Sequence, residues 1–238
     1  MSALWPQATL HTRWPGPSGR RGDPTFDRLL AAGQRLGSDA VSHQRASRDA
    51  VVALVDRIAG TSSPSRRVIL IGHSNAGPVL WLVPDARPGA VRAVVGLEPL
   101  GPTFADTPPS TPTAACPYGL TAIPMTYDPP VADPFTDLVR IVRAAASPDL
   151  ADCTLQAEPP RRWPNLADLP TLVVTGEASY HARYDWGIVA FLRQVGVDAE
   201  HMPLGDVGLT GNGHFMFMET NSDAVAEKVE EWLRGKGS

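Results

Sequence analysis

The fold is decided by the stretch Arg67-Val-Ile-Leu-Ile-Gly-His-Ser-Asn-Ala-Gly-Pro-Val-Leu-Trp-Leu-Val83. Its β-branched start, Val68 to Ile71, predicts a short strand that is buried on both faces and ends at Gly72. Its second half, Ala76 to Val83, predicts a helix that stops near Pro84. A strand that passes through a sharp turn into a helix is typical of a βαβ unit.

The turn between strand and helix carries a candidate nucleophile. In Gly72-His73-Ser74-Asn75-Ala76 the residues two before and two after the serine are small, as a strained strand-to-helix turn requires. The pattern predicts a nucleophile elbow that raises Ser74 at the carboxyl end of the sheet. The backbone N–H of Asn75, at the start of the helix, is then placed to stabilise an oxyanion. We expect His73 to be a packed neighbour rather than a catalyst.

The remaining periodic segments predict a parallel sheet with helical crossovers. Further strands are expected at Val91–Leu97, Thr171–Thr175 and His201–Leu204, and helices at 39–59 and Trp186–Val195. Thr220 and Asp223 form a capping-box pattern ahead of an amphipathic last helix. The predicted fold class is therefore α/β, with the C-terminal strands of a parallel doubly wound sheet.

Domain organisation follows from the proline distribution. We expect one domain over 1–238, with an irregular N-terminal arm over 1–38 and a cap inserted at about 101–170. More than half of the chain's 24 prolines fall in that insertion, which leaves little room for regular sheet. One helix is expected in it, capped by Asp133, opened by Pro134 and with an apolar face from Leu138 to Val142. The aromatic residues of the inserted segment are expected to form an apolar lid: Phe104, Tyr118, Tyr127 and Phe135.

A serine hydroxyl needs a base to take its proton, and in this order of elements the base follows the nucleophile. His214 lies in the glycine-rich loop Gly211–Phe215, between the last strand and the last helix, and is the predicted base. His181, just past the third strand, and His201, inside the fourth, are the alternatives.

The carboxylate that orients the base has two candidates. Glu98 ends the second predicted strand and Glu177 ends the third. Both strand ends face the same edge of the sheet, so topology leaves the choice open, although strand order alone favours Glu177.

Composition excludes several other classes of function. The net charge is −4, and the basic and acidic residues interleave, so no basic stripe indicates a nucleic-acid partner. No apolar stretch is long enough to span a membrane, and the first ten residues lack the pattern of a signal peptide, which predicts a cytoplasmic protein with no membrane partner. The spacing of Cys116 and Cys153 matches no zinc site, and the sequence does not decide whether the two residues form a disulfide. We expect no metal or organic cofactor.

Several motifs spread over nearly the whole chain point to a family: Leu4–Ala8, His11–Gly16, Gly22–Asp27, His73-Ser74, Asp85–Pro88, Glu98–Pro102, Tyr118–Thr121, Glu177–His181 and Gly211–His214. In these motifs the chain resembles a small branch of the α/β-hydrolase esterases, in which the triad acid follows the strand after the nucleophile strand. The resemblance implies an α/β-hydrolase fold and a Ser74–His214–Glu98 triad, with Glu177 in reserve. It also implies that members carry further residues ahead of the part matched here, including a second oxyanion donor.

The expected function is hydrolysis of small carboxylic esters through an acyl-enzyme, with amide or lactone hydrolysis as variants on the same fold. Because the strand at Val68 would then lie at an apolar sheet edge, the alternative is a short, inactive hydrolase-like protein that acts as a binding or association module. A homodimer fits the same edge. If a longer form exists, it could carry an export signal.

Overall fold

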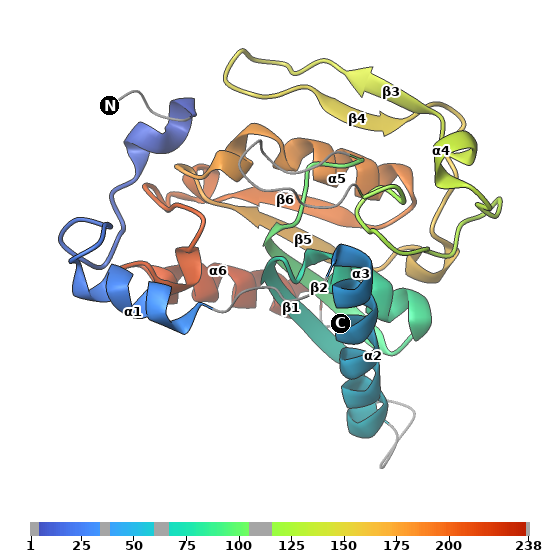
Figure 1. The fold of residues 1–238 in the computed structure, drawn as a ribbon, viewed down its shortest axis with the longest axis horizontal. Helices are drawn as coiled ribbons and strands as arrows, with labels where there is room; N and C mark the ends of the chain where they lie inside the picture. The colour runs from blue at the N-terminus through green and yellow to red at the C-terminus, as the bar shows by residue number, and fades with distance from the viewer. Residues whose placement is uncertain (1–4, 34–38, 60–66, 105–115, 237–238) are drawn as a thin grey trace.

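The computed structural model describes residues 5–33, 39–59, 67–104 and 116–236, and it centres on a four-stranded parallel sheet (Figure 1). The strands lie in the order β1 (Val68–Ser74), β2 (Val91–Pro99), β5 (Thr171–Thr175) and β6 (Ala199–Pro203). All four predicted strands are present, although the last begins at Ala199 rather than at His201. The chain is therefore an α/β protein with the expected parallel sheet.

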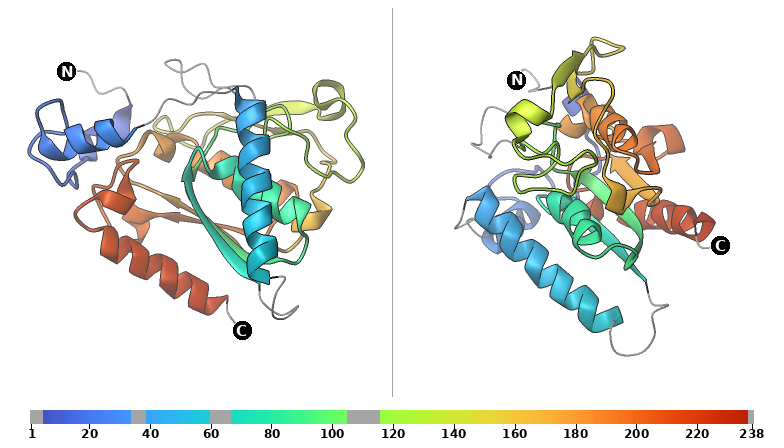
Figure 2. Two further views of the ribbon diagram at one scale, coloured as in Figure 1. Left: turned by 60° about the horizontal axis from the view of Figure 1, so that its bottom comes forward. Right: turned by 90° about the vertical axis from the view of Figure 1, so that its right-hand side faces the viewer.

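Helices cover both faces of the sheet. On one face lie α2 (Ala40–Ala59), α3 (Gly77–Ala86) and α5 (Asp185–Gln194), and on the other lies α6 (Ser222–Gly235) (Figure 2). Because side chains alternate along a strand, Val94 belongs to the core under α3 and α5, whereas Val95 belongs to the core under α6. This is the doubly wound arrangement that the sequence predicts.

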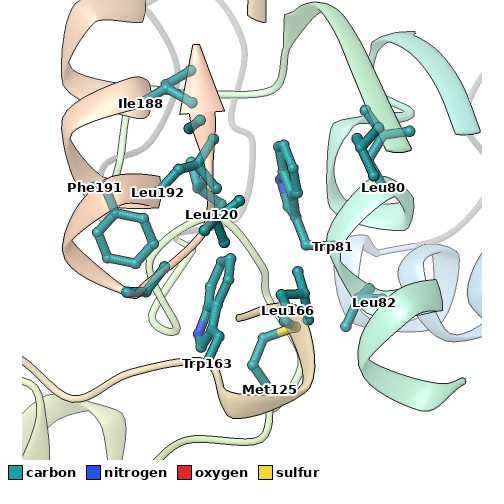
Figure 3. Packing of buried hydrophobic residues seen from close by; sticks show 14 of the residues in the cluster. Leu80, Trp81, Leu82, Leu120, Met125, Trp163, Leu166, Ile188, Phe191 and Leu192 are labelled. Carbon is teal, nitrogen blue, oxygen red and sulfur yellow. The ribbon is translucent and has the colours of Figure 1, made fainter. Parts of the chain in front are cut away.

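The segment after β2 contributes to the main core rather than standing apart from it. Leu120, Trp163 and Leu166 are fully buried and pack between Trp81 of α3 and Phe191 of α5 (Figure 3). Of the four aromatic residues expected in a lid, Phe104 and Tyr127 are buried in this core, and Phe135 is 70% exposed. The cap boundaries at about 101 and 170 stay a prediction, and residues 105–115 lie outside the described part.

The expected helix in that segment is only partly present. Asp133 accepts a hydrogen bond from Phe135 N at 3.0 Å, and Pro134 opens α4 (Pro134–Asp137), as predicted. The prediction of a helix through Leu138 to Val142 is wrong, because β3 (Arg140–Arg143) pairs antiparallel with β4 (Cys153–Gln156). Its β-branched residues suit a strand, and the hairpin lies on the outer side of α5 (Figure 1).

The N-terminal segment is more regular than expected. The prediction of an irregular arm is wrong where α1 (Pro24–Ala32) forms, with a short 3-10 helix, η1 (Pro6–Leu10), ahead of it. Asp23 caps α1 and Pro24 opens it, an arrangement that lowers the cost of starting a helix. The parts of the predicted arm at 1–4 and 34–38, Leu4 included, lie outside the described residues.

Three local predictions are corrected. Helix α3 continues through Pro84 to Ala86, because Val83 and Pro84 are buried against the sheet and packing outweighs the lost hydrogen bond. No capping box forms at Thr220, because Asn221 precedes α6 and exchanges side-chain hydrogen bonds with Asn212. Strand β1 lies at the end of the described sheet and is not buried on both faces, since Ile71 is 56% exposed.

Two further properties bear on the sequence predictions. Both cysteines are buried, and Cys153 carries a free thiol, so a bridge between Cys116 and Cys153 is not formed. Among the described helices, none is long and apolar enough to cross a membrane.

Candidate active site

Ser74 lies where β1 turns sharply into α3. Its φ of 52° is in the left-handed region, which residues other than glycine adopt only under constraint. The turn requires small neighbours: a Cβ on Gly72 would lie 3.0 Å from Leu80 Cδ2, and one on Gly77 would lie 2.4 Å from Leu100 N. The chain therefore makes a tight strand-to-helix turn at Ser74, which is the backbone arrangement that a nucleophile elbow requires, and the serine lies at the carboxyl end of β1.

His214 reaches this serine from the loop between β6 and α6. Its Nε2 lies 3.0 Å from Ser74 Oγ, within hydrogen-bond distance. Its Nδ1–H donates to Glu98 Oε2 at 2.5 Å. The three predicted residues are thus brought together from segments far apart in the sequence.

Glu98 is the next-to-last residue of β2, has a φ of 46° and is fully buried. Its Oε1 accepts a hydrogen bond from Gly176 N at 2.7 Å, and its Oε2 accepts one from Ser179 Oγ at 2.7 Å. These donors hold the carboxylate in one orientation toward His214. A buried carboxylate with several donors is well suited to hold an imidazole in a single tautomer.

Glu177, the other candidate acid, has a different partner. Its Oε2 accepts a hydrogen bond from Gly211 N at 2.7 Å, at the start of the loop that carries His214. Glu177 therefore holds the loop, whereas Glu98 contacts the imidazole.

The loop is fixed from its other side by the buried Glu219. Its carboxylate accepts hydrogen bonds from Gly213 N at 3.0 and 3.1 Å, from Asn212 Nδ2 at 2.8 Å and from His11 Nε2 at 2.7 Å. Since His11 belongs to the N-terminal segment, that segment takes part in positioning the base.

The two alternative bases, His181 and His201, have hydrogen-bond partners other than Ser74. His181 Nδ1–H donates to the buried Asp185 at 2.8 Å. His201 Nε2–H donates to Thr175 Oγ1 at 2.9 Å, and that hydroxyl donates to Asp185 at 2.7 Å. Neither histidine has a hydrogen bond to Ser74 among the described contacts, so the structure places neither as its base.

The two residues beside the serine have separate environments. His73 packs against the ring of His214 at 4.4 Å between centroids, and its Nε2–H donates to the His214 carbonyl at 2.8 Å. Asn75 is exposed in the turn toward α3, at the position whose backbone N–H serves an oxyanion in nucleophile elbows.

Burial sets the protonation of the base. It lowers the pKa of His214 to about 3, with a further contribution from the nearby His181, so the imidazole is neutral and able to accept a proton at neutral pH. Burial raises the pKa of Glu98 above its usual range. Burial also opposes protonation of His181, but the charge and hydrogen bond of Asp185 outweigh it and raise the pKa of that imidazole.

One short turn of the site carries functional candidates that the sequence reasoning missed. Ser179 donates to Glu98, and Tyr180 Oη lies 3.4 Å from His214 Nε2. The sequence feature that could have indicated them is their place in the Glu177–His181 motif, which follows the end of the third predicted strand.

The described residues form one cavity beside the site and one groove along α6. A cavity of about 530 Å³ lies between the N-terminal segment and the histidine loop, where Trp14, Phe26 and Phe215 are among the lining residues together with His214. A groove of about 470 Å³ runs between Ile71 on β1 and the apolar side of α6.

The described residues contain one group with spacing for a metal ion. Glu98, His181 and His214 offer ligand atoms within 4.8 Å of one another. However, both oxygens of Glu98 and both ring nitrogens of His214 already take part in hydrogen bonds. A metal would have to displace those contacts, so the donor set fits a proton-transfer site better than a metal centre.

Fold and site define an α/β protein with a serine, a histidine and a glutamate in one line of hydrogen bonds. No family model matches the chain. It is similar to a protein of Fungal sp. (strain ATCC 74256) described as "Probable secreted lipase phiG", with 43% identity over 231 residues. The match covers 97% of this chain but 61% of the relative, so the chain spans about three-fifths of the relative's length.

A solved structure described as "The Atomic Resolution Structure of a Novel Bacterial Esterase" matches with 17% identity and a TM-score of 0.44, over 77% of this chain and 43% of that one. The relative's name describes a secreted protein, so the expectation of a cytoplasmic protein finds no support there.

Proposed function

We propose that the chain is a serine hydrolase that cleaves carboxylic esters through an acyl-enzyme, with Ser74, His214 and Glu98 as its triad. The observation that carries the proposal is the line of hydrogen bonds from Ser74 Oγ through both ring nitrogens of His214 to Glu98. Similarity to a protein described as a lipase supports an ester as the bond that is cleaved.

In this mechanism Ser74 Oγ attacks the acyl carbon while its proton passes to His214 Nε2. Glu98 stabilises the imidazolium through Nδ1–H, and the backbone N–H of Asn75 stabilises the oxyanion. The imidazolium then gives its proton to the departing alcohol, and water later releases the acyl group by the same steps in reverse order. Apart from the ester and the water molecule, every group that takes part in these steps belongs to the chain itself.

The substrate is proposed to be a small or moderately hydrophobic ester. The lining of the cavity beside His214 includes Trp14, Phe26 and Phe215, which suit an apolar group of such a molecule. A cap function for the segment at about 101–170 belongs to the same proposal. Neither nucleic acid nor a membrane is proposed as a partner.

A fluorophosphonate probe tests this function directly, because it reacts rapidly with an activated serine and far more slowly with an ordinary hydroxyl. We expect one probe per chain by intact mass, and no labelling of Ser74→Ala. Ser222→Ala, at the start of α6, is the matched control and should label like the parent chain. A folded sample that does not react would contradict the proposal.

The exposed edge of the sheet favours a second candidate function. Strand β1 ends the described sheet, and Ile71 contributes to the adjacent apolar groove. Such an edge can pair with a strand of another chain, so we propose association with a second copy as the alternative. Absence of labelling together with a stable dimer in sedimentation would favour this reading.

A further inference from the structure

Three consecutive residues after β5 contact the proposed triad. Ser179 donates to Glu98, Tyr180 places its hydroxyl near His214, and the ring of His181 stacks on the ring of His214. They share one turn, because Ser179 caps the short 3-10 helix η3 (Tyr180–Arg183) by accepting from His181 N. The turn therefore presents three different groups to one reaction centre.

Two hydroxyls converge on the same nitrogen of that centre. Ser74 Oγ lies 3.0 Å from His214 Nε2, and Tyr180 Oη lies 3.4 Å from it. Ser74 lies there because it is the proposed nucleophile, whereas the triad mechanism gives no role to a tyrosine. The position of the Tyr180 hydroxyl has to be explained by something else that approaches Nε2.

In the proposed reaction, the group that approaches His214 Nε2 is the departing alcohol. In ester cleavage Nε2 first takes the proton of the serine and then gives it to the leaving-group oxygen, so that oxygen must come within hydrogen-bond distance of Nε2. A hydroxyl that is 3.4 Å from the same nitrogen lies within reach of the same oxygen.

We propose that Tyr180 is a catalytic residue whose O–H donates a hydrogen bond to the leaving-group oxygen as the ester bond breaks. This inference rests on the proposed ester hydrolysis. The electron pair of the broken C–O bond goes to the leaving oxygen, which takes its proton from His214 Nε2 and departs as the alcohol. Tyr180 keeps its own proton and stabilises the negative charge that develops before the transfer is complete.

The surroundings of Tyr180 suit a fixed neutral donor. Trp5 packs edge-on against its ring at 5.8 Å between centroids and is itself held by a hydrogen bond from its Nε1 to Ala178 O at 2.9 Å. Burial, together with the nearby Glu98 and Asp185, raises the pKa of Tyr180 to about 12, so the hydroxyl keeps its proton at neutral pH.

A hydrogen-bond donor for the leaving group favours one class of ester. An alkoxide is a poor leaving group and gains most from a second donor, whereas a nitrophenolate departs without such help. We therefore assign the site to esters of aliphatic alcohols rather than to activated aryl esters.

The test compares Tyr180→Phe with the parent chain on two esters of one acid, ethyl butyrate followed by acid release and p-nitrophenyl butyrate followed by colour. We expect kcat/KM to fall about 10- to 100-fold for the ethyl ester and by less than about threefold for the nitrophenyl ester. Retained hydrolysis of the nitrophenyl ester also shows that the variant is folded.

Tyr184→Phe is the matched control. Tyr184 is the next tyrosine along the chain, its ring centroid lies 6.3 Å from that of Tyr180, and its buried hydroxyl has no hydrogen-bond partner in the described structure. This variant should leave the ratio between the two esters unchanged.

The outcomes separate this inference from the proposed function. An equal loss on both esters would overturn the inference, because it would place Tyr180 on the oxyanion or on the histidine rather than on the leaving group. Unchanged rates on both would overturn it as well. If fluorophosphonate labelling of the parent chain fails, the proposed function itself falls, whatever the variants do.

Discussion

His181 lies flat against His214, with ring centroids 5.0 Å apart and ring planes inclined by 8°. Asp185 raises the pKa of His181, so a positive charge is favoured on the ring that stacks against the proposed base. It adds to the effect of burial, which is the main cause of the low pKa of His214.

Replacement of His181 by glutamine is expected to move the acid limb of the kcat/KM profile to higher pH. Glutamine can still donate to Asp185, but it carries no charge, so the pKa of His214 should rise while burial keeps it below the value of free imidazole. The measurement is a pH profile on an uncharged ester. His201→Gln, which changes the far end of the same network, is the control. A limb that stays in place would rule out this electrostatic role.

The two glutamates are expected to differ sharply in their effect on turnover. Glu98→Gln should lower kcat roughly a thousandfold or more, since the amide cannot hold His214 in the same tautomer. Glu177→Gln should lower the free energy of unfolding by about 1 kcal/mol, through the weaker hydrogen bond to Gly211 N, with little change in kcat. Steady-state kinetics and urea unfolding of both variants give the comparison. The reverse order would assign the acid to Glu177.

Asp23 is expected to control the order of the N-terminal segment. Its carboxylate, 1% exposed, accepts hydrogen bonds from Trp14 Nε1, Ser18 N, Gly19 N and Thr25 N. Burial alone would raise its pKa, but these donors outweigh it and lower the pKa below the usual range. The stabilisation is therefore present above the unfolded-state pKa and is lost as the pH falls through the lowered value.

Asp23→Asn should make residues 5–33 more sensitive to protease at neutral pH, while the sheet stays resistant. Limited proteolysis followed by mass analysis measures this. Asp27→Asn, which changes the same kind of side chain within α1, is the control. Equal resistance of the Asp23 variant and the parent chain would show that the carboxylate does not hold the segment.

The open sheet edge gives a prediction about association. Ile71→Lys places a charge on an exposed apolar position of β1 and should shift a self-associating sample toward monomer in sedimentation velocity. Phe135→Lys, on the surface of α4, removes a comparably exposed apolar side chain away from β1 and is the control. If neither change alters the association state, the edge is not the interface.

The sequence predicted the sheet and the sharp turn from β1 into α3 well because both depend on local patterns. Val68 to Ile71 and the small residues around Ser74 specify their backbone within a few positions. The short run at Arg140 was misread because an apolar β-branched segment fits a strand or a buried helix, and its pairing with β4 is a distant contact.

The site was predicted less completely than the fold. His214 was predicted as the base because it lies between the last strand and the last helix, and the structure places its imidazole beside Ser74. Strand order alone favoured Glu177, and topology left the choice open because both strands end at the same edge of the sheet, whereas the family resemblance pointed to Glu98. Only the three-dimensional structure shows which carboxylate contacts the imidazole. Tyr180 was missed because a single aromatic residue after a strand has no periodic signature.

Ser74 and Glu98 both have positive φ, at the ends of neighbouring parallel strands. They are two of the four described non-glycine residues with positive φ, the others being Phe104 and Asp168. Each such backbone conformation costs on the order of 1–3 kcal/mol, so part of the main-chain strain is held by two residues of the proposed triad. Glycine at either position would relieve the strain and remove the chemistry together. A selection for thermal stability alone would therefore drive this chain toward an inert form, and activity has to be screened alongside stability if it is to be kept.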